Sequence, residues 1–470
     1  MTVDNINVEA AVKKVNDLLA IEKNISPALK AGLEVLLILI TILMNRLGLN
    51  SKNSSKPPST DLNRRKKPGG TGERKPGGQP GHSGSTLKQV DNPDEVKIIK
   101  VDKSALPQGN YREAGYEARQ VIDFNISTVV TEWRAQILKD DQGTRYVAPF
   151  PEGVTRPVQY GAGIKVNSVY MSQHQLIPYN RIEDHFFDQM QIPISSGSIY
   201  NFNQEAYSRL DYFEQWIKER LTSSCLLHVD ETGVNINGKR YWLHNTSNGE
   251  FSFFYPHRKR GSEALIEIGI LPAFQGTLCH DHYKTYFHYG VFHSLCNAHH
   301  LRELERAWEQ DKQQWAQKMM VLLKEINKAT DEAGGCLNIM SSEYYRKRYR
   351  DLIEEAEREC PAPDKIKGKK GRTPRSKARN LLERLKNFED DTLRFMDDKD
   401  VPFTNNQAEN DLRMIKVQQK ISGCFRSLEG ARVFCRIRSY LVTCRKQGIA
   451  ATHALRLLFE GKRPSFMTAE

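Results

Sequence analysis

The sequence has few cysteines, no Cys-x-x-Cys pair and no long apolar run. Its 470 residues include eight cysteines, a pattern that indicates a reducing cytosol rather than a disulfide framework. The longest apolar run, residues 35–44, has 10 residues and includes Thr41, whereas a membrane-spanning helix needs roughly 18. The N-terminus also lacks the basic start and apolar stretch of a signal peptide. We therefore expect a cytoplasmic protein with no membrane partner.

Positive charge is in excess, and it is concentrated in two segments. The chain has 69 Lys+Arg against 57 Asp+Glu, a formal net charge of +12. Residues 51–80 carry eight basic residues against two acidic ones, and residues 361–380 carry eight against one. Their composition fits either solvated linkers or flexible arms that neutralise phosphates. The candidate DNA contacts in these segments are Arg64, Arg65, Lys66, Lys67, Lys369, Lys370 and Arg372.

The first 50 residues have the pattern of helices. Ser26-Pro27 is a typical helix start, and the apolar residues from Leu29 to Leu47 then alternate four and three apart, as in a heptad seam. Further apolar residues lie off this seam, so more than one face must be buried. Self-association or docking on the rest of the chain would do this. We assign residues 1–50 as a helical, coiled-coil-like oligomerisation segment and expect a homo-oligomer.

Length and composition predict two to four domains, and the 39% hydrophobic residues exclude wholesale disorder. Residues 51–88 read as a basic flexible linker, and residues 89–155 alternate in the manner of strands, which predicts a small β-rich module. Residues 156–222 are a helical DNA-binding candidate. Within them, Ser195-Ser196 begins either the second helix of a helix-turn-helix or an ordinary packed helix.

From residue 223 onward, strand-like runs alternate with helical ones. Asn237-Gly238 lies between two such runs and is a strong hairpin signal. The order is three antiparallel strands, a helix, two more strands and a helix, which by analogy predicts an α/β ribonuclease-H-like catalytic domain. Its parts would be residues 223–308 (the first part of the catalytic core), 309–400 (a helical insertion with a basic loop) and 401–470 (a catalytic helix and basic helical tail). The expected strands are residues 225–231, 240–244, 250–255, 276–280 and 291–295, and the expected helices are residues 262–268 and one from about residue 298.

Three acidic residues are candidates for a two-metal site. Asp230 and Asp281 follow the first and fourth expected strands, and Glu409 lies on a helix that Asn405-Asn406 would cap. Carboxylates that converge on a pair of Mg²⁺ ions are what phosphodiester chemistry by two metals requires. Glu231 and Asp411 are the rival acids. Glu231 should point to the other side of its strand, and Asp411 should face elsewhere on its helix.

Cys296 and His299 form a Cys-x-x-His pair after the fifth expected strand. A metal site there would need further ligands, for which His293 and His300 are available. The alternative is a buried cysteine beside a histidine that fixes the fold.

Further side chains near the acids are candidates for contact with nucleic acid. Lys284, Arg413 and Lys416 could touch phosphates, or they could be solvated surface residues. Trp242 is either a base-stacking residue or part of the core of a hairpin.

At these residues the sequence resembles the transposases of the insertion sequence 66 family. The resemblance implies a DDE-type enzyme with a ribonuclease-H-like domain and a helical insertion before its last acid. It also implies that Asp230, Asp281 and Glu409 are the catalytic and metal-binding triad, with two Mg²⁺ or Mn²⁺ ions. The matching stretches are NSSKPPSTD (53–61), GGQPGHSG (77–84), HVDETGVNINGKRYWLH (228–244), HDHYKTYF (280–287), HSLCNAHHLREL (293–304) and NNQAENDLR (405–413).

The same resemblance implies DNA cleavage and strand transfer at the ends of a mobile element. The partners would be double-stranded DNA, as terminal inverted repeats and target, and small accessory proteins of the element. Two alternatives remain open, a nuclease or resolvase of the same fold that does not join strands and an inactive DNA-binding descendant.

The sequence departs from the family in one respect. Members typically carry a cysteine zinc module after the GGQPGHSG stretch, but no cysteine precedes Cys225 here, and His82 alone cannot supply four ligands. We therefore expect no N-terminal cysteine zinc site.

Overall fold

A computed structural model provides the structure of the chain and describes residues 2–3, 6–22, 25–47, 49–50, 53–54, 87–363 and 373–468. The chain divides into two units, residues 1–64 with 148–470, and residues 65–147. The basic candidates in the two arms lie outside the described residues, namely Arg64, Arg65, Lys66, Lys67, Lys369, Lys370 and Arg372.

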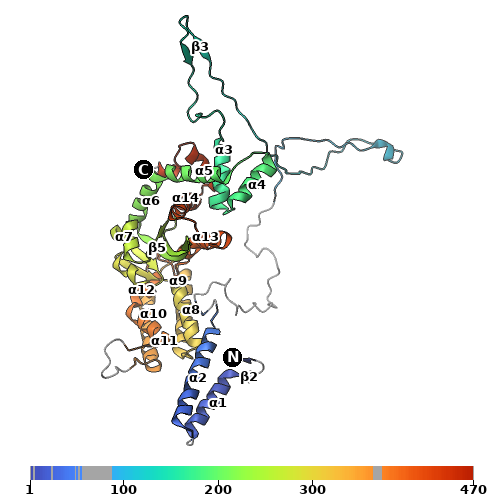
Figure 1. The fold of residues 1–470 in the computed structure, drawn as a ribbon. Helices are drawn as coiled ribbons and strands as arrows, with labels where there is room; N and C mark the ends of the chain where they lie inside the picture. Colours follow the sequence, from blue (N-terminus) through green and yellow to red (C-terminus); the bar gives the residue numbers. More distant parts are fainter. Residues whose placement is uncertain are drawn as a thin grey trace. The chain divides into compact units, whose positions relative to one another are not determined.

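The N-terminal segment holds two helices, α1 (Val8–Ile21) and α2 (Pro27–Leu47), drawn in blue in Figure 1. Two very short strands, β1 (Thr2–Val3) and β2 (Ile6–Asn7), precede them. Helix α2 begins where the sequence predicts, because the Ser26 hydroxyl accepts a hydrogen bond from the Leu29 N–H at 3.3 Å.

Helix α2 is strongly apolar and mostly exposed. Its first 18 residues have a mean hydropathy of 2.0, and 6% of them are buried. By length and composition alone, this helix is long and apolar enough to cross a membrane. A few polar residues interrupt its apolar residues, but they lower the mean hydropathy of the helix only slightly. The short uninterrupted run at residues 35–44 does not reveal this. The absence of a membrane partner therefore stays a prediction.

Residues 87–155 form far less strand than the alternating pattern predicts. In the described part of the second unit, residues 87–147, the regular elements are a 3₁₀ turn, η2 (Lys103–Ala105), and an antiparallel hairpin of β3 (Ile137–Lys139) and β4 (Arg145–Val147). Strands need a second layer to bury their apolar face, and the described residues supply none here. The exposed apolar side chains include Val96, Ile98, Ile99, Val101, Tyr116, Val121 and Phe124.

A helical block follows and packs against the end of the chain. Its core combines Val169, Ile199 and Phe213 with Leu455 near the C-terminus. The Ser195 side chain starts the third of its α-helices by accepting a hydrogen bond from the Ser198 N–H at 3.2 Å. The elements are α3 (Ala162–Val169), the π-helix η3 (Tyr170–His174), α4 (Tyr179–Met190), α5 (Ser196–Arg209) and α6 (Asp211–Thr222).

The centre of the first unit is a five-stranded mixed sheet in the order β7-β6-β5-β8-β9. The three consecutive strands β5, β6 and β7 are antiparallel, and β8 and β9 run parallel to β5. All five strands overlap the runs expected from the sequence. The predicted hairpin is present, with Asn237 and Gly238 at φ values of 47° and 74°, as a tight turn between twisted strands requires. The strands are β5 (Leu226–Ile236), β6 (Lys239–Ser247), β7 (Ser252–His257), β8 (Thr277–His280) and β9 (Phe292–Leu295).

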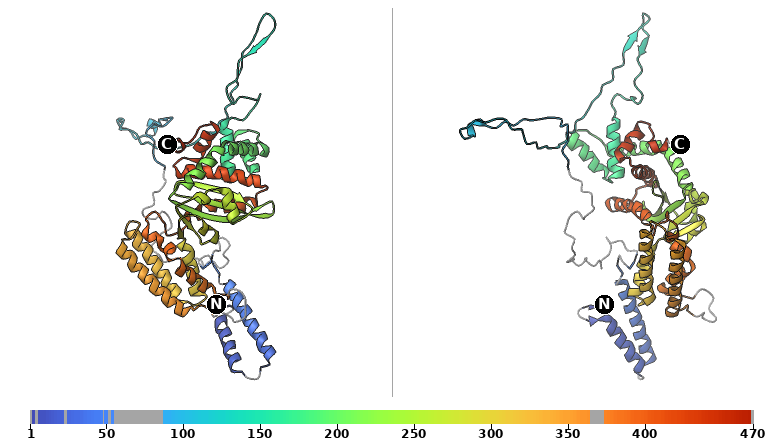
Figure 2. Two further views of the ribbon diagram at one scale, coloured as in Figure 1. Left: turned by 90° about the vertical axis from the view of Figure 1, so that its left-hand side faces the viewer. Right: turned by 180° about the vertical axis from the view of Figure 1, so that it is seen from behind.

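Helices cover both faces of the sheet, so the prediction of an α/β protein is confirmed. Figures 1 and 2 show the sheet between α7 (Ser262–Ile268) on one side and α13 (Asn406–Ser422) on the other. Side chains at alternate positions of β5 point to opposite faces of the sheet. Val229 packs in the same apolar core as Leu265 of α7, and Val234 packs in the same core as Ile415 of α13. Two 3₁₀ turns, η4 (Leu271–Ala273) and η5 (Lys284–His288), flank β8.

The remaining helices form a separately packed bundle and the C-terminal end. The bundle buries Trp315 and Tyr349 completely in its own apolar core. Its helices are α8 (Asn297–Glu309), α9 (Gln314–Glu332), α10 (Ile339–Glu359), α11 (Lys377–Asn387) and α12 (Glu389–Asp397). The C-terminal elements after α13 are α14 (Leu428–Lys446), α15 (Ala451–Phe459) and η6 (Ser465–Met467).

Candidate active site

The register of two parallel strands sets Asp230 beside Asp281. Strand β5 pairs with β8 so that Leu226 lies opposite Thr277 and His228 lies opposite Cys279. The same register, continued by two residues, places Asp230 level with Asp281. Side chains alternate along a strand, so both carboxylates lie on the face of the sheet that carries α13.

Each of these two aspartates is held by its own backbone. Asp230 Oδ1 accepts a hydrogen bond from the Glu231 N–H at 2.8 Å, and Asp281 Oδ1 accepts one from the Tyr283 N–H at 3.1 Å. Between Asp281 and Tyr283, His282 has a φ of 73°, a strained value for a residue other than glycine. The His282 N–H donates to His280 Nδ1 at 3.2 Å, which supports this tight turn.

Asn405 fastens the start of α13 to the strand that carries Asp230. Its side-chain NH₂ donates to the Val229 carbonyl at 2.9 Å, and its Oδ1 lies 2.8 Å from His228 Nδ1. Its backbone N–H donates to the sulfur of Cys296 at 3.2 Å. The Asn405 side chain makes no capping bond to the helix, contrary to the sequence prediction, because it is fully engaged by β5. One turn on, Glu409 lies close enough for its charge to act on Asp230.

Glu409 lies among polar groups of α8. Its Oε2 is 3.6 Å from the Arg302 guanidinium, and its Oε1 is 3.7 Å from His299 Nδ1. Among the described residues, neither Oε1 of Glu409 nor Nδ1 of His299 makes a hydrogen bond, although both atoms are buried. Cys296 completes a group whose potential ligand atoms all lie within 4.8 Å of one another.

The charges of Asp281 and Glu409 act on Asp230. Burial, followed by the negative charges of Glu231, Asp281 and Glu409, raises the pKa of Asp230 well above its ordinary value. Like charges gathered in this way favour the binding of a cation. Among the described residues, the ligand atoms of the three acids do not all lie within 4.8 Å of one another.

The two rival acids are engaged elsewhere. Glu231 is buried in an ion pair with Arg260, whose Nε donates at 2.6 Å, and it also accepts a hydrogen bond from the Tyr286 hydroxyl. Asp411 accepts hydrogen bonds from Lys446 at 3.0 Å and from Ser252 at 2.8 Å. These pairs indicate structural roles for both side chains.

The residues present fit a hard divalent cation better than zinc. Asp230, Asp281 and Glu409 offer carboxylate oxygens, which Mg²⁺ prefers. Zinc in a structural site wants four nitrogen or sulfur ligands, and the two further candidates have other partners. His293 lies 3.3 Å from His280, and His300 lies 3.0 Å from Asn297.

Cys296 is also poorly suited to a metal. Burial raises the pKa of its thiol, and its sulfur already accepts the Asn405 N–H.

The basic candidates near the acids differ in their surroundings. Lys284 on η5 and Arg413 on α13 are exposed. Lys416 donates to the Gly233 carbonyl at 2.9 Å. Burial and the nearby charge of Arg240 lower the pKa of Lys416, whereas the charge of Asp230 raises it.

Sequence reasoning missed the clamp that Asn405 forms and the pairing of Glu231 with Arg260 and Tyr286. Both involve residues far apart along the chain, so no local pattern marks them. The sequence offered two local signals for these contacts. Glu231 is an acidic residue next to Asp230 on a mostly apolar strand, and Asn405-Asn406 is a polar pair before Glu409.

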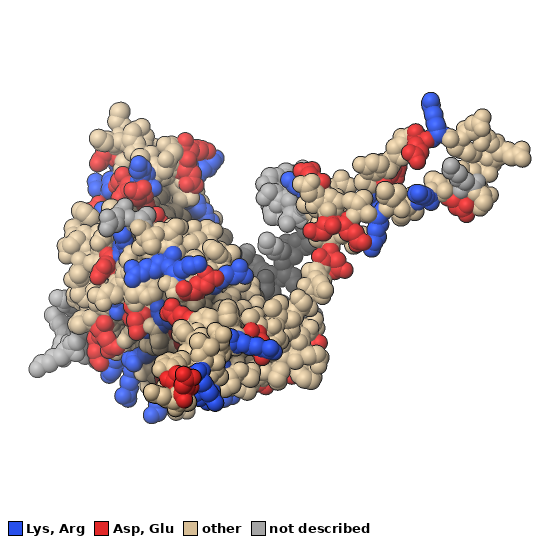
Figure 3. Space-filling model, turned by 90° about the horizontal axis from the view of Figure 1, so that it is seen from above, with Lys and Arg blue, Asp and Glu red and all other residues tan. Residues whose placement is uncertain are grey.

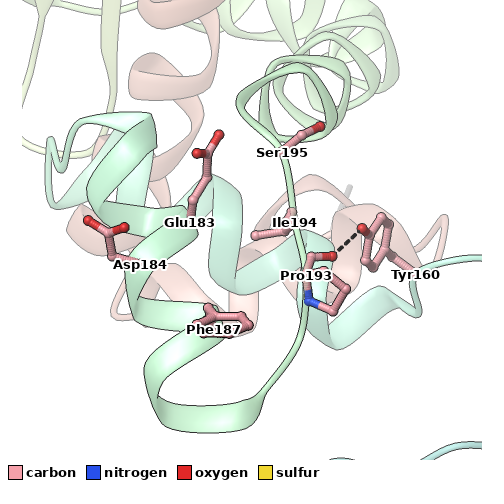
Figure 4. A pocket seen from close by; sticks show the side chains of 7 residues that line it. All are labelled: Tyr160, Glu183, Asp184, Phe187, Pro193, Ile194 and Ser195. Carbon is pink, nitrogen blue, oxygen red and sulfur yellow. Dashed lines mark hydrogen bonds between the residues drawn. The ribbon is translucent and has the colours of Figure 1, made fainter.

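A cavity of about 540 Å³ lies away from these residues, between α4 and the segment that leads into α5. Figure 4 shows Glu183 and Phe187 on the side of α4 towards that segment, where the Tyr160 hydroxyl donates to the Pro193 carbonyl at 2.6 Å. No predicted site residue lines it. On the face drawn in Figure 3, basic and acidic side chains are interspersed, so the positive charge forms no single large patch there.

The fold is that of an α/β protein with one candidate carboxylate within β5, one directly after β8 and one on the adjoining helix α13. Strand β5 continues to Ile236, so Asp230 lies inside the strand and not at its end, contrary to the sequence prediction. A family model described as "Transposase IS66 family" matches residues 157–433, and this chain belongs to that family. This confirms the resemblance seen in the sequence motifs. A second model, "Family of unknown function (DUF6444)", matches residues 2–88.

One curated relative is similar over a short stretch. It is the "Uncharacterized protein y4jO" of Sinorhizobium fredii (strain NBRC 101917 / NGR234), 35% identical over 75 residues. The match covers 16% of this chain and 23% of that protein.

Proposed function

We propose that this chain is a DNA transposase with a ribonuclease-H-like catalytic domain, whose catalytic residues are Asp230, Asp281 and Glu409. One observation carries the proposal. The register of β5 and β8 sets Asp230 level with Asp281, and the charges of Asp281 and of Glu409 on α13 both help to raise the pKa of Asp230. The sheet order, with three antiparallel strands followed by two parallel ones, supports the same reading.

The three carboxylates would hold two Mg²⁺ or Mn²⁺ ions, which when bound supply charge stabilisation for phosphodiester cleavage and transfer. The rest of the chemistry depends on how this chain positions its groups. Backbone N–H groups fix one oxygen of Asp230 and one of Asp281, which leaves their other oxygens free. Asn405 sets the position of Glu409 relative to β5.

The reaction would have two steps at the same site. Water attacks the phosphodiester at the end of the element and leaves a 3′ hydroxyl. That hydroxyl then attacks a phosphodiester of target DNA, and the 3′ oxygen of the target strand leaves as the new bond forms. The substrates are double-stranded terminal repeats and target DNA, in the cytoplasm.

The other parts of the chain would serve binding and assembly. Residues 156–222 and the two basic arms would contact DNA, together with Lys284, Arg413 and Lys416. The exposed apolar helix α2 would pair with a second copy, so that both ends of the element are held in one complex. Accessory proteins of the element would be further partners.

A strand-transfer assay tests this function. Labelled DNA fragments from either side of the coding region are incubated with the full chain, Mg²⁺ and a target plasmid. We expect labelled plasmid as the product, and no such product when the 3′ hydroxyl of the fragment is blocked. Cleavage without joining would instead indicate a nuclease or resolvase, and binding without cleavage would indicate a DNA-binding descendant.

A further inference from the structure

A group of arginines and aromatic rings lies on the face of the sheet opposite the carboxylates and has no role in the chemistry described so far. On β6, Arg240 and Trp242 are two residues apart and so lie on the same face of the sheet. The Arg240 guanidinium lies 4.8 Å from the centre of the Trp242 ring. Arg260 lies 4.8 Å from the same ring and 4.1 Å from the ring of Tyr283. We call Arg240, Trp242, Arg258, Lys259, Arg260 and Tyr283 the arginine–tryptophan patch.

The backbone around the patch is shaped to hold these side chains. Gly233 lies opposite Trp242 on β5, and a Cβ at this glycine would lie 3.2 Å from Arg240 Nε. The missing side chain therefore leaves room for Arg240 over the strand. The turn after β7 is fixed by His257, whose Nδ1 accepts the Lys259 N–H at 2.9 Å.

The patch carries positive charge that the described part of the chain does not neutralise. Arg240, Arg258 and Lys259 are exposed, and among the described residues no carboxylate pairs with them. Arg260 is paired with Glu231, but its side chain remains 38% exposed. A planar guanidinium stacked on an indole ring keeps its N–H edge free, which suits it to phosphate oxygens.

The patch meets the acid site at Tyr283. The Tyr283 ring contacts Arg260, and the Tyr283 N–H donates to Asp281. An anionic strand that approaches three carboxylates is repelled, and cations nearby offset part of that repulsion.

We propose that the arginine–tryptophan patch binds the phosphate backbone of the DNA that reaches the carboxylate site, on the face of the sheet opposite the carboxylates. Arg240 is the main phosphate contact, and Trp242 is a positioning residue that holds Arg240 and Arg260 in place. The inference rests on the proposed function for its choice of ligand, and it assigns that ligand a specific surface.

The test measures binding separately from cleavage. The full chain is titrated against a fluorescent DNA duplex of arbitrary sequence at several salt concentrations, and affinity is read from anisotropy. Because each phosphate contact contributes about −0.9 to the slope of log K against log salt, Arg240→Ala should reduce the slope by about 1 and weaken binding several-fold. Arg358→Ala, an exposed arginine on α10, is the matched control and should change neither.

Trp242 variants test the positioning role without a change of charge. Trp242→Leu should weaken binding although every cation remains, whereas Trp242→Phe keeps a stacking ring and should bind nearly as the unmodified chain does. Arg240→Ala changes an exposed side chain, so it keeps the test open if Trp242→Leu does not fold.

The outcomes separate the two proposals. Unchanged affinity and salt slope for Arg240→Ala, in a chain that still cleaves DNA, would overturn the patch alone. Binding that depends on Arg240 in a chain that never cleaves DNA would overturn the transposase function and leave the patch standing.

Discussion

Replacing Asn405 by alanine should separate the acids without touching any of them. The Asn405 amide joins β5, which carries Asp230, to α13, which carries Glu409. Asn405→Ala removes the donor to the Val229 carbonyl and the acceptor for His228. Asn405 and both partner residues are buried, so each partner is left without a hydrogen bond.

The magnitude follows from these two lost bonds. A buried polar group left unsatisfied costs about 1–3 kcal/mol, so Asn405→Ala should lower the free energy of unfolding by about 2–5 kcal/mol. Release of α13 also moves Glu409. A displacement of about 1 Å in a catalytic group can cost about 10²-fold in rate, so cleavage by the folded protein should fall by about that factor.

Urea unfolding and DNA cleavage at matched folded fraction are the two assays. Asn406→Ala changes the exposed neighbour at the first position of α13 and serves as the control. Asn405→Asp keeps the acceptor for His228 but adds a negative charge near the acids, so its loss of stability should lessen at low pH. The reasoning is refuted if Asn405→Ala unfolds at the same urea concentration as Asn406→Ala and cleaves DNA equally fast.

Three further substitutions should have distinct effects. Asp230→Asn should abolish cleavage yet make the metal-free protein more stable at neutral pH. Because the pKa of Asp230 is raised in the folded protein, its contribution to stability is complete below about pH 3.8 and is lost as the pH rises. Thermal unfolding should therefore show that the gain in stability of Asp230→Asn vanishes in acid, and the exposed control Asp400→Asn should show no gain. Gly276→Ala places a Cβ 2.3 Å from the Cys225 carbonyl oxygen and should cost about 1–3 kcal/mol, whereas Gly249→Ala, with no atom within 4 Å, should not; equal urea midpoints would contradict this. Glu231→Gln should raise stability at neutral pH, because burial outweighs the pairing with Arg260 and raises the pKa of Glu231, and a lower urea midpoint would contradict this.

The sheet was predictable because its signals are local. Apolar runs of strand length mark all five strands, and Asn237-Gly238 fixes the first hairpin through its positive φ values. The short helix α7 has the bounds that the sequence predicts, residues 262–268. The parallel register of β5 and β8 was not predicted from the sequence, and it sets Asp230 beside Asp281.

Features that depend on distant partners were not predictable. The role of Asn405 depends on Val229 and Cys296, which local periodicity does not connect to it. The expected β-rich module at residues 89–155 was wrong in extent, because alternation signals a half-buried strand only where a second layer covers it. Helix α2 was predicted to be a helix, but its composition does not determine what covers its apolar surface, which could be a partner, a helical bundle or a membrane.

The assignment of the three acids is tested most directly by DNA cleavage with single substitutions. Labelled end DNA is incubated in Mg²⁺ with Asp230→Asn, Asp281→Asn or Glu409→Gln, and binding is measured in parallel. We predict that each substitution abolishes cleavage and joining while DNA binding persists, and that the exposed Asp400→Asn control retains both activities. Wild-type cleavage by any one of the three variants would contradict the assignment.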